Sequence, residues 1–212
     1  MDAKEFRRNA RFYNKALAFT STGGSGHLVG MMYEGRGPPM YKIQGEIYHQ
    51  LGSLLPNPNC PPVYSQLFIY DPGDALRFRL SRNSERNPAT MSALQDVMND
   101  CHPFVNVYRQ AFELTRITSV PDYHLRLHFL RATDRHRYNI PSASHELAAI
   151  IPGDIDTCVN SRDVIIRPRG GPLQRVSECN PAYVTLHFPL LAPTGQEGWN
   201  INIPYVNTPS PS

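Results

Sequence analysis

Two histidines, His124 and His128, are the most obvious candidates for metal binding in this sequence. On a helix, histidines four residues apart can chelate one ion. Residues 123–130 instead alternate between apolar and polar types, with Leu125 and Leu127 on one face, and this alternation predicts a strand. At about 3.3 Å per residue the two imidazoles would lie ~13 Å apart, too far to share an ion. We therefore expect exposed sheet histidines, with a metal role as the less favoured alternative.

Three further stretches resemble parts of catalytic or ligand-binding motifs but lack the remaining residues of those motifs. Residues 144–146 (Ser-His-Glu) match a hydrolytic triad only in composition, since triad members meet in space and no G-x-S-x-G elbow is present. Asp154 and Asp156 could bind a cation, but a turn after Pro152 explains them better. The glycine-rich tract 22–26 is followed by no Lys-Ser or Lys-Thr, which excludes a P-loop. We predict no catalytic residue, no bound metal, no cofactor and no enzymatic activity.

The most compact basic cluster lies on a predicted N-terminal helix. Apolar residues at positions 6, 10, 13 and 17 recur at helical spacing and should face the core. Arg8, Arg11 and Lys15 follow one another at i, i+3 and i+7, which places them in one stripe. A solvated helix face is the more common meaning of such a stripe, and contact with phosphates is the functional one. The glycine tract should end this helix.

A second cluster, of arginines, lies in the C-terminal part. Residues 164–167 and 174–176 predict the two strands of a hairpin, with Gly170 and Gly171 in the turn. Arginines on both strands, beside glycines that leave the backbone accessible, can approach phosphates closely. The arginines are Arg162, Arg167, Arg169 and Arg175, and the rings that could stack on unpaired bases are Trp199, Tyr138, Tyr183 and Phe188. The alternative is a surface arginine cluster with aromatic residues in the core.

The elements that would position these residues predict an α+β fold: an N-terminal helix, a central helical pair, and a mixed or antiparallel sheet with a C-terminal hairpin. Asn87 with Pro88 can start the first central helix, whose apolar stripe is Met91, Leu94, Val97, Met98 and Cys101. His102 and Pro103 break the pattern and can start the second. Residues 63–70 predict a buried strand that ends in a turn at 71–73, and residues 144–151 a short helix.

Length and composition set the outer limits of function. The chain has 212 residues, a net charge of +3 and 41% hydrophobic residues, enough for one large domain or two small ones. We expect an N-terminal part at 1–120, a strand-rich part at 121–204 and a disordered tail at 205–212, although one continuous domain is the alternative. Four dispersed cysteines argue against structural zinc, and the lack of a signal peptide or long apolar run indicates an intracellular protein.

Eight stretches of the chain, in order, resemble the N-terminal region of Helitron rolling-circle transposases, upstream of and entering the replication-initiator nuclease domain. Three of them contain RRNARFYNKALAFTS, GEIYHQLGSLLP and NPAYVTLHFPLLAPTGQEGW. The stretches are residues 6–21, 35–38, 45–56, 66–71, 137–149, 162–166, 171–178 and 180–199. In that family one long chain joins this region to a nuclease and a helicase.

The resemblance implies a nuclear, non-catalytic accessory region of a transposase, here as a truncated fragment, because the nuclease and helicase motifs of the family would lie beyond Ser212. Its expected partners are single-stranded or distorted DNA and the nuclease and helicase domains of a full-length protein. The expected DNA-binding residues are Arg8, Arg11, Lys15, Arg162, Arg167, Arg169, Arg175 and Trp199. The alternatives are a scaffold that packs on the nuclease domain, a host-retained interaction module, or a degenerate copy without function.

Overall fold

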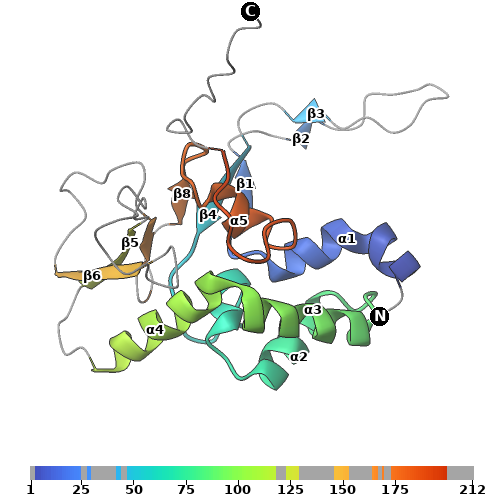
Figure 1. Cartoon of the computed structure of the whole chain (residues 1–212), viewed down its shortest axis with the longest axis horizontal. Coiled ribbons are helices and arrows are strands. Elements are labelled where there is room, and N and C mark those ends of the chain that lie inside the picture. Colours follow the sequence, from blue (N-terminus) through green and yellow to red (C-terminus); the bar gives the residue numbers. More distant parts are fainter. Residues whose placement is uncertain are drawn as a thin grey trace, which may run out of the picture.

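A computed structural model describes residues 3–24, 28–29, 42–43, 47–117, 123–128, 146–152, 164–166, 169 and 173–199. Within these residues the predicted α+β class and the N-terminal helix are confirmed (Figure 1). The helices are α1 (Ala3–Leu17), η1 (Tyr64–Phe68, a 3₁₀ helix), α2 (Pro72–Arg82), α3 (Pro88–Cys101), α4 (Pro103–Ile117) and α5 (Tyr183–His187). The strands are β1 (Ser21–Gly24), β2 (Leu28–Val29), β3 (Lys42–Ile43), β4 (Ile47–Leu51), β5 (Tyr123–His128), β6 (Glu146–Pro152), β7 (Val164–Ile166) and β8 (Gln174–Val176).

The central helical pair begins and breaks where the sequence predicts. The Asn87 side-chain oxygen accepts hydrogen bonds from the backbone N–H groups of Ala89 (2.9 Å) and Thr90 (3.1 Å). Pro88 follows at the first helical position, where its missing N–H costs nothing. Helix α4 starts directly after His102, the residue that ends α3. A side-chain cap thus marks the start of α3, and a first-turn proline marks the start of α4.

The prediction of a buried strand at residues 63–70 is wrong, because residues 64–68 form the 3₁₀ helix η1. The side chain of Gln66 closes the turn, because its oxygen accepts from the Val63 N–H at 3.0 Å and its amide donates to the Ser53 carbonyl at 2.9 Å. A short apolar run buries equally well as a strand or as a helical turn. The side-chain hydrogen bonds of one buried glutamine, which periodicity does not reveal, decide between them.

The prediction of a turn at residues 71–73 is also wrong, because these residues cap and begin helix α2. The Asp71 carboxylate accepts the Gly73 N–H at 2.9 Å, and Pro72 occupies the first helical turn. Helix α2 then buries Arg79, whose Nε donates to the Ala16 carbonyl of α1 at 3.3 Å. Burial lowers the pKa of Arg79 to about 9, so the guanidinium stays protonated at neutral pH. This buried cation fixes α2 against the C-terminal end of α1, the end that attracts positive charge.

The described strands form two antiparallel three-stranded sheets, in the orders β1-β4-β8 and β6-β5-β7, and an antiparallel pair, β2-β3. The predicted C-terminal hairpin is therefore wrong, because β7 pairs with β5 and β8 pairs with β4. The helix predicted for residues 144–151 is also wrong, because Ile150 lies opposite Leu125 in the β6–β5 pair. Short apolar strands carry little information about their partners, so long-range packing selects the pairs.

The core gathers around Phe19, just after α1. Its ring stacks on Phe68 at 4.5 Å and on Tyr108 at 5.5 Å between centroids. Of the predicted apolar stripe on α3, Met91, Leu94 and Met98 are buried, whereas Val97 and Cys101 are exposed. The buried stripe is therefore narrower than predicted, and α3 packs against α1, α2 and α4.

Residues on both sides of position 120 share this core. Strand β8 pairs with β4, and the Phe19 N–H donates to the Leu186 carbonyl of α5 at 2.9 Å. Leu186 and Val176 are buried in the same cluster as α1. The C-terminal elements β8 and α5 therefore position surface residues next to the N-terminal helix. The predicted tail at 205–212 lies outside the described residues.

Candidate nucleic-acid interface

Helix α1 separates an apolar face from a basic face. Tyr13 and Leu17 are fully buried in the core, as predicted, and Phe6 packs against it. At about 100° per residue, all the basic residues of the helix fall within an arc of about 100° on the other side. They are Lys4, Arg7, Arg8, Arg11 and Lys15, and each of them is exposed. The predicted stripe of Arg8, Arg11 and Lys15 thus forms part of a larger surface, which we call the basic face.

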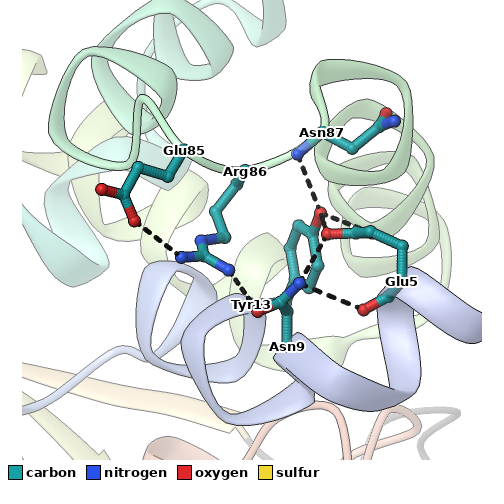
Figure 2. Close-up of polar contacts among 6 residues, drawn as sticks. All are labelled: Glu5, Asn9, Tyr13, Glu85, Arg86 and Asn87. Carbon is teal, nitrogen blue, oxygen red and sulfur yellow. Dashed lines mark hydrogen bonds and ion pairs between the residues drawn. The ribbon is translucent and has the colours of Figure 1, made fainter.

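The only acidic residue of α1, Glu5, is turned away from this face. Its carboxylate accepts hydrogen bonds from the Tyr13 hydroxyl at 2.8 and 2.9 Å and from the Asn9 amide at 2.9 Å (Figure 2). The Tyr13 oxygen in turn accepts the Asn87 N–H at 3.0 Å. Burial, with Glu5 beside it, raises the pKa of Tyr13, so its hydroxyl remains a donor. The network holds the negative charge at the α1–α3 contact and leaves the basic face without an acid of its own.

Among the described residues, Arg7, Arg8, Arg11 and Lys15 form no ion pair and no side-chain hydrogen bond with one another or with their neighbours. Four such charges in one arc repel one another unless an anion lies between them. The face therefore has the electrostatic character of an anion-binding surface.

One border of the basic face is formed by Phe12 and Arg86. The guanidinium of Arg86 lies 4.5 Å from the centroid of the Phe12 ring, and 52% of Phe12 is exposed. Arg86 is itself held in place, because it donates to the Asn9 side-chain oxygen and pairs with Glu85 at 3.2 Å (Figure 2). An aromatic ring of fixed orientation thus lies directly beside the basic face.

The opposite border is formed by the segment that follows α5. The Asn14 amide donates to the His187 carbonyl at 3.0 Å, and its oxygen accepts the Leu190 N–H at 3.2 Å. These two bonds dock residues 187–190 on α1, next to the side of the helix that carries Arg7 and Arg11. Phe188 and Leu191 are exposed there, Leu191 to 77%. The basic face is therefore bordered by exposed apolar side chains on both sides.

The arginines predicted further along the chain are not gathered with this face. Arg175 lies on β8, across β4 from α1 (Figure 1), and stacks over the Tyr48 ring at 5.2 Å. It lines an open depression of about 670 Å³ together with Glu178. Arg169 is exposed in an isolated bridge with Leu55. The remaining predicted arginines, Arg162 and Arg167, lie outside the described residues.

Of the predicted stacking rings that the structure describes, Trp199 is the most exposed, at 64%. The preceding Gly198 packs on Val184 of α5 and donates its N–H to the Pro181 carbonyl at 2.8 Å. The indole is thus carried by an anchored stretch of backbone. Phe188 is partly exposed and Tyr183 half-buried, whereas Tyr138 lies outside the described residues.

A pair of stacked histidines was missed by the sequence analysis. The rings of His49 and His187 lie 3.3 Å apart between centroids, and Thr20 contacts the His187 Nδ1 at 3.3 Å. Burial, together with His49, lowers the pKa of His187 to about 4, and burial also lowers the pKa of His49. Only the packing of α5 on β4 brings these distant residues together, so no local sequence signal could have revealed the pair.

The predicted strand at His124 and His128 is confirmed, since both residues lie on β5. In the part of the chain that the structure describes, no three His, Cys, Asp or Glu residues gather in a way that could hold a metal ion.

None of the described helices has the length and apolar character needed to cross a membrane.

No protein-family model, curated protein or solved structure matches this chain.

Proposed function

We propose that the chain is a non-catalytic DNA-binding accessory region, which holds single-stranded or distorted DNA along the basic face of α1. The observation that carries the proposal is the concentration of exposed cations on one arc of one helix, with Glu5 turned to the other side. Lys4 and Lys15 are separated by about 16 Å of helix axis at 1.5 Å per residue. A length of this size spans about five phosphates of one strand at 3.4 Å each, the axial spacing of a strand in a B-form helix.

A basic amphipathic helix can also bind a membrane surface or a partner groove. Both need the apolar face of the helix. In this chain Tyr13 and Leu17 of that face are fully buried in the core. Only the charged side of α1 is available, which favours a polyanion over a lipid bilayer.

The resemblance to Helitron transposases supports the same proposal and supplies its setting. In that setting the region works in the nucleus beside the nuclease and helicase domains of a full-length transposase. Arg175 would then belong to a separate contact, because β8 lies across the sheet from α1, and Arg169 lies beside Leu55 rather than on α1. Near Arg175 the acidic Glu178 offsets part of the charge, so we assign most of the DNA affinity to α1.

A scaffold that packs on the nuclease domain is the second candidate. It is favoured by the exposed apolar side chains Leu173, Leu191 and Trp199, of which Leu191 is exposed to 77%. A scaffold would use these side chains and would show no affinity for free DNA. The two candidates therefore differ in a single binding measurement.

The test is a titration of labelled oligothymidylate against salt concentration. Each phosphate contact on a single strand contributes about −0.7 to the slope of log K against log salt, so four contacts give a slope of roughly −3. Arg11→Gln should flatten the slope by about 0.7 and weaken binding to unrelated sequences equally, because a phosphate contact carries no base information.

The matched control is Arg77→Gln, an exposed arginine on α2 that pairs with Asp74. It removes the same charge away from the basic face and should leave the slope unchanged. Absence of binding at low salt would refute the proposal and favour the scaffold. Equal effects of the two substitutions would reduce the binding to non-specific attraction by net charge.

A further inference from the structure

Phe12 stands apart from the other aromatic residues of α1. Phe6 and Tyr13 pack in or against the core, whereas Phe12 is 52% exposed. Its neighbours at i−4 and i+3 are Arg8 and Lys15, both on the basic face. Side chains at these spacings have Cβ atoms about 5–6 Å apart. The ring therefore lies at the edge of the basic face, within reach of a nucleotide whose phosphate contacts either cation.

The Phe12 ring is also held in place. Arg86 lies over it at 4.5 Å, and the guanidinium of this 13% exposed side chain is itself bound by Asn9 and Glu85. With the guanidinium in place, 52% of Phe12 is still exposed to solvent. An exposed ring that is already ordered loses little entropy when a second flat group stacks on it.

From this geometry we infer that Phe12 is a stacking site for an unpaired base of single-stranded nucleic acid bound along the basic face. The inference rests on the proposed function, which supplies the phosphate contacts beside the ring. Aromatic side chains stack on any base because every base has a flat face, so the site selects for unpaired bases rather than for sequence. In a duplex the base faces are covered by neighbouring base pairs, and the ring would gain nothing.

Charge alone does not predict this selectivity. A duplex carries about twice the charge per unit length of a single strand, so the basic face by itself favours the duplex. A preference for the single strand that depends on Phe12 would therefore report stacking.

The experiment compares wild type and Phe12→Ala on three ligands: an oligothymidylate of about 16 nucleotides, a strand of equal length with abasic sites, and the corresponding duplex. The variant should bind the oligothymidylate roughly 5- to 150-fold more weakly, with an unchanged salt slope. On the abasic strand and on the duplex, the two proteins should bind within a factor of two of each other, on the order of the smallest effect such titrations resolve. Phe12→Tyr should restore the affinity, because it restores a flat ring.

Phe78→Ala is the matched control, since Phe78 also carries an arginine, Arg77, at 5.8 Å from its ring but lies on α2 away from the basic face. It should leave all three affinities unchanged. If Arg11→Gln flattens the slope while Phe12→Ala has no effect, the stacking site is refuted and the proposed function stands. A loss for Phe12→Ala that is equally large on the abasic strand also refutes stacking. If no ligand binds at low salt, both are refuted.

Discussion

Replacing Tyr13 by phenylalanine removes one oxygen atom from the centre of the network in Figure 2 and leaves the buried ring in place. The lost hydroxyl donates to the Glu5 carboxylate at 2.8 Å and accepts the Asn87 N–H at 3.0 Å. A hydrogen bond to a charged acceptor contributes about 1.5–3 kcal/mol. The Asn87 N–H also loses its acceptor, which can only add to this cost. We expect Tyr13→Phe to lower the free energy of unfolding by about 2 kcal/mol.

Urea denaturation followed by circular dichroism measures this loss, as a lower midpoint with an unchanged m-value. A double-mutant cycle with Glu5→Ala, which removes the acceptor, isolates the contact, and the coupling free energy should be about 1.5 kcal/mol or more. A loss for Tyr13→Phe below about 0.5 kcal/mol, or a coupling near zero, would contradict the reasoning. Glu5 would then not be held by Tyr13, and its charge could reach the basic face.

Substitutions at three further positions test other contacts. His187 has a pKa lowered to about 4, so between pH ~6.5 and ~4 the unfolded chain binds a proton that the folded chain does not. The free energy of unfolding should therefore fall by about 1–2 kcal/mol over this range, a value reduced because solvent screens the charge of the half-buried ring. In urea titrations at several pH values, His187→Gln should flatten this profile. A profile unchanged by His187→Gln would contradict that assignment. Gly198→Ala would place a β-carbon 2.5 Å from the Val184 Cγ2, so the free energy of unfolding should fall by about 1–3 kcal/mol and the melting temperature should drop with it. An unchanged melting temperature would contradict the close packing. Asn87→Ala should cost about 1 kcal/mol through the lost helix cap and Asn87→Gly only a few tenths, and equal losses would argue against capping.

Helices with local start signals were predictable from the sequence, and elements fixed by distant partners were not. Asn87 and the His102–Pro103 break determine α3 and α4 through groups within three residues of each helix start. By contrast, η1 depends on the Gln66 amide bonded to Ser53, and the β8 pairing depends on β4, more than a hundred residues earlier. Apolar periodicity specifies which side of a segment is buried, but not the segment against which it packs.

The same distinction holds for the candidate site. The stripe of Arg8, Arg11 and Lys15 could be predicted because all three lie on one helix, where spacing alone determines the face. The role of Phe12 could not, because its order depends on Arg86, seventy-four residues away, and on the bond from Arg86 to Asn9. The later arginines were predicted to gather on a hairpin, and this prediction is wrong because β7 pairs with β5 and β8 pairs with β4.

The most direct test of the central claim compares two triple variants of equal charge. One changes Arg8, Arg11 and Lys15 of the basic face to glutamine, and the other changes the exposed arginines Arg77, Arg82 and Arg116. Both lower the formal net charge from +3 to zero. We predict that the slope of log K against log salt for single-stranded DNA is flatter by about 2 in the first variant, at about 0.7 per lost contact. The second variant should bind like wild type. Equal binding by the two variants would contradict the assignment of the DNA-binding surface to helix α1.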